Sequence, residues 1–318
     1  MAKMCSQKVE GRKSHSFWDN FKKNWQLHLL MLLPFLYVII FEYAPLYGLQ
    51  IAFKDFRIRD GIWNSVWVGL KHFEKFFSNY KWSMYVGNTV KISLYTIAVG
   101  FPIPIILALM IHVSENKWLK KLTQNISYIP HFFSVVVMVG ILWQILNPFS
   151  GIFAALGNLT GWKIFSMDLR VNPDAFIHTY VWSGVWQSMG WSSIVYLSAL
   201  SAVPEELHEA AKLDGASRWK RVLHVDLPTI MPTICTMLIL RFGSLMNVGR
   251  DKVFLMQTAM NKDVSEVIST YVYKNGLAKN QFSYGTAVGL MNSVINICLV
   301  LLVNWIVKKI SKDERNLF

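Results

Sequence analysis

Six long apolar runs, separated by polar and charged segments, constrain the fold of this chain more than any other feature. A helix of about 20 apolar residues is long enough to cross the hydrocarbon core of a bilayer. Prolines in or near such runs are tolerated where neighbouring helices satisfy the freed backbone groups. The sequence therefore predicts an all-α integral membrane protein with six transmembrane helices. Their expected limits are 27–47, 86–112, 126–147, 175–201, 227–248 and 284–307.

The composition agrees with a membrane protein. Of the 318 residues, 53% are hydrophobic and 16% are charged, whereas a soluble domain averages about 25% charged residues. The net charge of +13 could indicate nucleic acid, but the basic residues lie between the apolar runs and form no stripe. We therefore expect contact with the lipid bilayer and no nucleic-acid partner. Cys5, Cys235 and Cys298 are far apart, so neither a disulfide framework nor a metal site is expected.

The distribution of Lys and Arg predicts the orientation in the membrane. With a cytoplasmic N-terminus, the segments on the cytoplasmic side carry the larger share of the basic residues, as the positive-inside rule requires. Both termini are then cytoplasmic. The expected divisions are an interfacial N-terminal segment (1–26), the first transmembrane helix with an external loop (27–83), a transmembrane core containing the loop 202–226 (84–308), and a cytoplasmic tail (309–318).

The loop 202–226, called the coupling loop below, is the most informative polar segment. Pro204 suits the first turn of a helix, where its missing N–H is no loss. Three glutamates follow near the positive end of that helix dipole. Asp214-Gly215 predicts a turn, because Gly accepts backbone angles closed to other residues. The loop is therefore expected to form two short helices that make a rigid, protruding unit; an ordinary amphipathic loop on the membrane surface is the alternative.

The spacing within this loop is distinctive. Glu209-Ala210-Ala211 is followed after three residues by Gly215, and after nine more by Val225-Asp226-Leu227-Pro228. This order resembles the signature cytoplasmic loop of ABC-importer permeases, with Val225 in place of the family's isoleucine. The resemblance extends over about 84–308.

Segments near the C-terminus resemble one branch of these permeases. VISTYVYKNGL (267–277), FSYGTAVGL (282–290) and LLVNWIVKK (301–309) are similar to polysaccharide-type sugar permeases related to the maltose permeases. Arg250 departs from that pattern, since an aromatic residue is expected there. The branch imports oligosaccharides released from plant, algal or host glycans, so the resemblance implies an oligosaccharide substrate.

The resemblance also implies partners and a mechanism. A type I importer works by alternating access in the bacterial inner (cytoplasmic) membrane. It pairs this subunit with a second homologous permease, two ATP-binding-cassette ATPase subunits and an extracytoplasmic solute-binding protein. The chain contains no G-x-x-x-x-G-K-[ST] sequence. We therefore expect a permease subunit that is not an enzyme and binds no cofactor itself, with ATP and magnesium held by the partner ATPases.

The coupling residues follow from the resemblance. It implies that Glu209 makes a charge contact with an arginine of the ATPase, that Ala210 and Ala211 allow close approach, and that Gly215 allows the bend. The predicted ATPase-coupling residues are Glu209, Ala210, Ala211, Asp214, Gly215, Leu227 and Pro228.

Candidates for the sugar path lie in the fourth span and beyond. Sugars present polar edges and apolar C–H faces, which suit aromatic platforms beside amide donors. The alternative is that these aromatic residues anchor the helix at the interface and the polar ones join helices. Arg241 is a costly charge within an apolar run, and such charges indicate function by default. The predicted path residues are Trp182, Trp186, Gln187, Trp191, Tyr196, Asn247 and Asn292.

Other chemistry has little support in the sequence. The histidines are scattered singly with no metal-ligand spacing, so no metal site and no catalytic residue is expected. An ion-gradient-driven secondary transporter stays open as an alternative, although no inverted repeat is evident. So does an ABC permease for a non-sugar solute. The external loops carry a small excess of basic residues, which is compatible with an acidic sugar but does not establish one.

Overall fold

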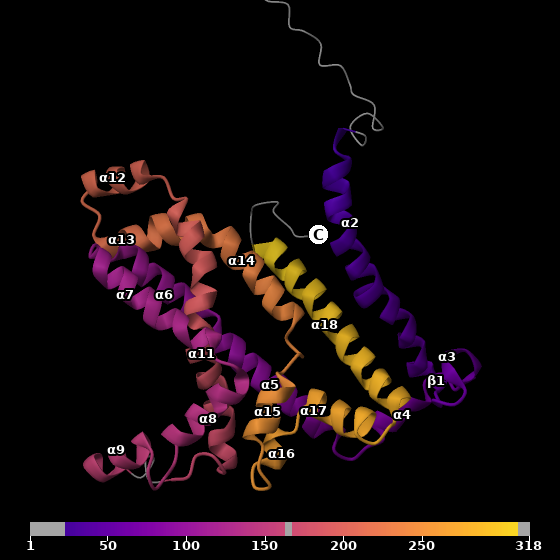
Figure 1. The fold of residues 1–318 in the computed structure, drawn as a ribbon. Coiled ribbons are helices and arrows are strands. Elements are labelled where there is room, and N and C mark those ends of the chain that lie inside the picture. Colours follow the sequence, from indigo (N-terminus) through magenta and orange to yellow (C-terminus); the bar gives the residue numbers. More distant parts are fainter. Residues whose placement is uncertain (1–22, 163–166, 311–318) are drawn as a thin grey trace, which may run out of the picture. The chain divides into compact units, whose positions relative to one another are not determined.

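The computed structural model describes residues 23–162 and 167–310, which are almost entirely helical (Figure 1). Among them the only sheet is a two-stranded antiparallel ladder of β1 (Lys54–Asp55) and β2 (Val66–Trp67). The all-α prediction is confirmed. Most of the expected interfacial segment 1–26 and of the tail 309–318 lies outside the described residues. The chain divides into two compact units, residues 1–50 and 51–318.

The described part of the first unit, which begins at residue 23, is one helical segment. It consists of α2 (Trp25–Val38), the π-helical turn η1 (Ile39–Tyr43) and most of the 3-10 helix η2 (Ala44–Phe53). Within the described part of this unit, no residue of α2 or η1 is buried. A helix that is apolar on all sides is typical of a membrane span, because lipid can surround it.

The second unit is organised around α11 (Pro173–Ser201). This helix packs most extensively against α6 (Pro102–Val113) and α5 (Trp82–Gly100) (Figure 1). It also contacts α7 (Lys117–Tyr128) and α14 (Leu227–Gly243), and α14 packs in turn along α18 (Phe282–Ile310). The bundle therefore has α11 and α14 as its two connecting helices.

Small residues allow the close helix contacts of this bundle. A methyl group placed on Gly190 in α11 would collide with the backbone of Ser127 in α7. In lipid, helices associate through van der Waals packing and interhelical hydrogen bonds, since the surrounding acyl chains remove most of the hydrophobic drive. Gly190 therefore sets how near α7 can lie to α11.

Short elements connect the long helices. The segment between α14 and α18 is fixed onto α5, because Thr89 accepts a hydrogen bond from the amide of Ile268 at 2.9 Å and Asn88 donates to the carbonyl of Glu266 at 3.0 Å. The short elements are α3 (Gly61–Asn64), α4 (Lys71–Phe77), η3 (Ile129–Phe132), α8 (Val135–Ile145), α9 (Ile152–Thr160), α12 (Glu205–Leu213), α13 (Arg218–Arg221), η4 (Val222–Asp226), α15 (Arg250–Met256), α16 (Lys262–Ser265), α17 (Ile268–Val272) and η5 (Tyr273–Leu277).

Four helical stretches of the described chain are long and apolar enough to cross a membrane. They correspond to the predicted runs 27–47, 86–112, 227–248 and 284–307. The second of them is α5 and α6 joined at the Phe101-Pro102 junction. The stretches are Trp25–Phe53, Trp82–Val113, Arg218–Gly243 and Phe282–Lys309.

The predicted run 126–147 is bent. Lys117–Phe132 and Val135–Ile145 meet at 108° and make a fifth candidate span if they are counted together. The cause is local: Phe133 is extended, and Ser134 then caps the new helix by accepting a hydrogen bond from the amide of Val137. An apolar run alone does not reveal such a break, and the predicted span 126–147 is found as two helices.

The predicted run 175–201 is α11, whose 29 residues are about 43 Å long at 1.5 Å per residue. That length is sufficient to span a bilayer, but α11 is not among the stretches that are also apolar enough. Its serines, Gln187 and tryptophans lower its hydropathy. α11 therefore has the length of a span but a lower hydropathy than the four stretches above.

Candidate functional site

The coupling loop forms two short helices, as the sequence predicts. α12 starts directly after Pro204, which is extended, and carries Glu205 and Glu206 in its first turn. These carboxylates lie at the positive end of the helix dipole, where they stabilise it by about 0.3–1 kcal/mol each. Glu209, Ala210 and Ala211 follow on the same helix.

The bend between the two helices depends on Gly215. Its φ is +74°, in the left-handed region that favours glycine. Gly215 donates its amide to the carbonyl of Lys212 at 3.0 Å, and Ala216 donates to that of Ala211 at 2.9 Å, which together close the end of α12. Ser217 then caps α13. Asp214 and Gly215 thus occupy the turn itself.

From α13 onward the chain stays helical into the membrane core. Arg218–Gly243 forms one stretch of 26 residues through α13, η4 and α14. Leu227 and Pro228 are the first two residues of α14, and Pro228 follows the π-helical turn η4, where the amide of Leu227 donates to the carbonyl of Val222. The end of the coupling loop and α14 are therefore parts of one helical stretch.

The loop presents an exposed surface. Glu209, Ala210 and Asp214 are exposed, and so are two large apolar side chains, Leu213 at 90% and Trp219 at 74%. Large apolar groups that protrude on a rigid helical unit beside a carboxylate are typical of a docking surface. The loop is held to the α6–α7 connection by an ion pair between Arg218 and Glu115 at 2.8 Å.

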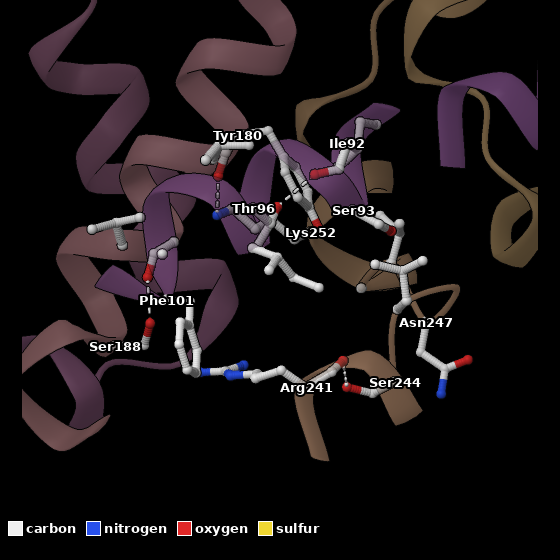
Figure 2. A pocket seen from close by; sticks show the side chains of 18 of the residues that line it. Ile92, Ser93, Thr96, Phe101, Tyr180, Ser188, Arg241, Ser244, Asn247 and Lys252 are labelled. Atoms are coloured by element: carbon white, nitrogen blue, oxygen red, sulfur yellow. Dashed lines mark hydrogen bonds between the residues drawn. The ribbon is translucent and has the colours of Figure 1, made fainter. Parts of the chain in front are cut away.

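A cavity of about 320 Å³ lies between α5, α11, α14 and the segment that follows α14 (Figure 2). Hydroxyl and amide groups line it, among them Thr96, Gln187 and Asn247. Two cationic side chains, Arg241 and Lys252, also reach it. Among the described residues that line this cavity none carries a carboxylate, so the cavity is electropositive.

Lys252 is fixed in the cavity wall. Its Nζ donates to the carbonyl of Tyr180 at 2.7 Å and lies 4.5 Å from the centre of the Tyr180 ring (Figure 2). Burial lowers the pKa of Lys252 to about 7. The α15 backbone that carries it packs against α8 and α11, so the position of the ammonium group is set by the fold.

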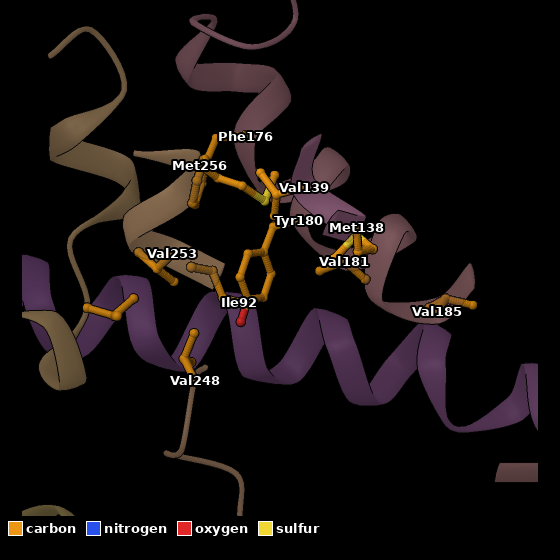
Figure 3. Close-up of a cluster of buried hydrophobic side chains, with 11 residues drawn as sticks. Ile92, Met138, Val139, Phe176, Tyr180, Val181, Val185, Val248, Val253 and Met256 are labelled. Carbon is orange, nitrogen blue, oxygen red and sulfur yellow. The ribbon is translucent and has the colours of Figure 1, made fainter. Parts of the chain in front are cut away.

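Tyr180 joins the cavity to the apolar core. Its ring packs among buried residues of α5, α8, α11 and α15, including Ile92, Met138 and Val253 (Figure 3). Dense packing of this kind restricts side chains to one arrangement. The cavity wall at Tyr180 and Lys252 is therefore preformed.

The predicted path residues divide into three groups. Gln187 and Asn247 line the cavity, and Asn292 donates to Asn247 at 3.2 Å. Trp182, Trp186 and Trp191 are 51%, 40% and 47% exposed and lie outside the cavity lining. Trp182 donates to Tyr95 at 3.1 Å, and the ring of Trp191 stacks on His131 at 4.5 Å.

Tyr196 makes up the third group. It is only 3% exposed and packs in a cluster with Ile105, Ala108, Leu200 and Ile230. Its place in that apolar cluster is a packing position.

Two features of the structure were not predicted from the sequence: a buried lysine and a three-residue cluster. Lys252 stands in a polar segment outside the apolar runs. Charged residues were singled out from the sequence only within those runs, so Lys252 was not identified. His112, His208 and Asp226 are far apart in the sequence, yet one atom from each lies within 4.8 Å of the others. Their spacing follows from tertiary packing and matches no local motif.

A multi-pass helical membrane protein with a polar cavity among its helices and a protruding helical loop has the features of a transport permease. The chain belongs to the family of binding-protein-dependent transport system inner membrane components, whose model matches residues 100–312. The family is one of transport permeases, which are membrane subunits without a catalytic site. The resemblance seen in the sequence is thereby confirmed.

Curated relatives and solved structures agree with this assignment. The chain is 37% identical to the polygalacturonan/rhamnogalacturonan transport system permease protein YteP of Bacillus subtilis, over 90% of this chain and 89% of that protein. It is also 37% identical to Protein LplB of the same organism, over 96% and 95%. A crystal structure of a bacterial ABC transporter involved in the import of the acidic polysaccharide alginate contains a chain with a TM-score of 0.83 and 33% identity, covering 93% of this chain and 99% of that one.

Proposed function

We propose that this chain is the transmembrane subunit of an ATP-binding-cassette importer that carries an acidic oligosaccharide across a bacterial inner membrane by alternating access. The observation that carries the proposal is the continuous helix Arg218–Gly243. One end of it adjoins the exposed coupling loop, and Arg241 near the other end lines the electropositive cavity. One continuous helical stretch, which includes the π-helical turn η4 and Pro232, thus links the energy input to the path.

Coupling begins at α12. In the proposed complex, its exposed face inserts into a groove of an ATPase subunit, with Glu209 paired to an arginine there. ATP and magnesium are bound by the ATPases, and this chain binds neither. Closure of the ATPase dimer on ATP displaces α12, and the unbroken helix through η4 moves α14. The cavity between α5, α11 and α14 then changes its accessible side.

The proposed topology has six crossings with both termini in the cytoplasm. The five candidate spans, with the bent pair counted as one, are completed by α11, whose length of 29 residues is sufficient. The coupling loop then faces the cytoplasm, where an ATPase can reach it. The half-exposed tryptophans of α11 face a second homologous permease, and an extracytoplasmic binding protein delivers the sugar.

The substrate class rests on charge. The cavity holds the cations Arg241 and Lys252, and none of its described lining residues offsets them with a carboxylate. Polygalacturonan and alginate, named for the relatives above, are polymers of sugar carboxylates. A buried ammonium or guanidinium group gains most from an anionic partner where water is excluded. Gln187 and Asn247 would bind the sugar hydroxyls.

The test is purification of the tagged chain from native membranes, followed by an ATPase assay of whatever copurifies. We expect a second permease and an ATPase subunit, with hydrolysis stimulated by oligogalacturonate or oligoalginate together with the binding protein. Neutral oligosaccharides of the same length serve as the matched control. Equal stimulation by neutral and acidic sugars would refute the acidic substrate, and recovery of a transport-competent chain without an ATPase would refute the importer.

A further inference from the structure

Three side chains from three elements converge beneath the coupling loop. His112 ends α6, His208 lies in α12 and Asp226 ends η4. The Nε2 of His208 is 3.1 Å from Oδ1 of Asp226, and the Nε2 of His112 is 3.7 Å from the same oxygen. One nitrogen or oxygen atom from each residue lies within 4.8 Å of the other two.

Two of these three atoms are buried and lack a hydrogen-bond partner in the part of the chain that the structure describes. The side chain of Asp226 is 1% exposed, and those of His208 and His112 are 16% and 27% exposed. Within the described chain, neither Oδ1 of Asp226 nor Nε2 of His208 has a partner in hydrogen-bonding geometry. A buried polar group without a partner costs about 1–3 kcal/mol, and a carboxylate costs more. A bound group that contacts Oδ1 of Asp226 and Nε2 of His208 would remove this cost.

Among the described residues, no lysine or arginine forms an ion pair with Asp226. Arg218 is paired with Glu115, and Lys120 donates to the backbone carbonyl of His112. A second cavity, of about 480 Å³, adjoins the cluster; Arg221 lines it, but its Nε is itself without a hydrogen-bond partner in the described chain. The carboxyl group of Asp226 therefore faces two imidazole nitrogens.

Zinc fits this arrangement. Zn²⁺ binds histidine nitrogen and carboxylate oxygen at about 2.0–2.2 Å in tetrahedral geometry, which places neighbouring ligand atoms about 3.3–3.6 Å apart. The separations of 3.1 and 3.7 Å lie close to that range. The adjoining cavity leaves room for a water molecule as the fourth ligand. We propose that His112, His208 and Asp226 form a binding site for a divalent transition-metal ion such as zinc at the base of the coupling loop.

The position of the site gives the ion a role. It would join α12, the docking helix, to the end of α6 and to the turn that leads into α14. An ion there clamps the coupling loop to the membrane helices and holds the angle at which α12 is presented. This site is separate from the sugar cavity. The metal proposal therefore does not depend on which sugar is transported.

The test uses the full transporter complex in lipid nanodiscs, stripped of metal with a chelator and then titrated with zinc. We expect one additional zinc per copy of this chain by elemental analysis, a raised thermal unfolding midpoint, and a tetrahedral spectrum when cobalt(II) replaces zinc. His208→Asn and Asp226→Asn should each weaken binding by at least about tenfold, since even losing a group that only supports a metal ligand costs 10–100-fold. His224→Asn is the matched control, because that histidine is exposed in the same loop and bonds to the carbonyl of Lys220.

The outcomes decide the proposal directly. Zinc bound equally by the wild type and by the His208→Asn complex would place the metal on the partner subunits and overturn the site. A wild-type complex that takes up no extra zinc would also overturn it, and the cluster would then be a histidine–carboxyl contact without a metal. If Asp226→Asn fails to fold, His112→Asn replaces it, since that side chain is the most exposed of the three.

Discussion

At the residue scale, Gly190 and Lys252 are positions where the structure requires a particular side chain, for two different reasons. Gly190 must lack a side chain, because α7 lies against its Cα. Lys252 must keep a charged side chain inside the protein, where burial depresses its pKa. The first demand comes from packing. The second destabilises the folded protein, because a charged group is buried. Buried charges of this kind are concentrated at functional sites.

Gly190→Ala should destabilise the protein. The added methyl group collides with the backbone of Ser127, and overpacking of this kind costs about 1–3 kcal/mol. The thermal unfolding midpoint of the purified complex measures the effect. Gly140→Ala in α8 is the control, because nothing lies within 4 Å of its added Cβ. A midpoint unchanged by Gly190→Ala would contradict the close α7–α11 contact.

Lys252→Met should lower the apparent affinity for acidic oligosaccharides roughly 10–100-fold, because a hydrogen bond to a charged group contributes about 1.5–3 kcal/mol. With its pKa near 7, Lys252 gains its charge as the pH falls through that value. Wild-type affinity should therefore rise from pH 8 to pH 6, while sugar carboxylates stay ionised. KM for sugar-stimulated ATP hydrolysis measures both effects. Lys71→Met, an exposed lysine of α4, is the control; a variant with wild-type KM and pH profile would contradict the account.

At the element scale, two helices differ in what their sequences reveal. The two short helices of the coupling loop follow from Pro204 and Gly215, because each stands where its backbone properties are needed, whereas the continuity of α13 and η4 with α14 does not follow from the predicted span 227–248. The break between α7 and α8 does not follow from the sequence, because Ser134 caps a helix only once the chain has turned. Local chemistry predicts helix ends, whereas the direction in which a chain leaves them depends on packing.

Glu209→Lys should uncouple transport without preventing membrane insertion. Glu209 is exposed on α12, so its replacement removes nothing from the core. At an interface with the ATPase, disruption of a buried charge pair costs about 2–5 kcal/mol. Sugar uptake and ATPase copurification should both fall at least tenfold, and Glu209→Gln should give an intermediate loss. Normal uptake by Glu209→Lys, at wild-type expression, would argue against the coupling role.

At the scale of the whole molecule, the sequence predicted the class of protein better than the details of its path. The apolar runs and the Glu209–Pro228 spacing are local, so they can be recognised without the fold. The cavity is assembled from α5, α11, α14 and Lys252, which are distant in the chain. For that reason Gln187 and Asn247 could be proposed from residue type, whereas the place of Tyr196 in an apolar cluster could not. The convergence of His112, His208 and Asp226 likewise exists only after folding.

Uptake of a labelled oligogalacturonate into proteoliposomes tests the central claim most directly. The complex is reconstituted with the binding protein on one side and ATP on the side of the ATPase subunits, and ion gradients are collapsed with ionophores. We predict uptake that requires ATP and the binding protein, persists without ion gradients and is lost in Glu209→Lys. Uptake that continues without ATP and stops when the gradients collapse would contradict the account and identify a secondary transporter.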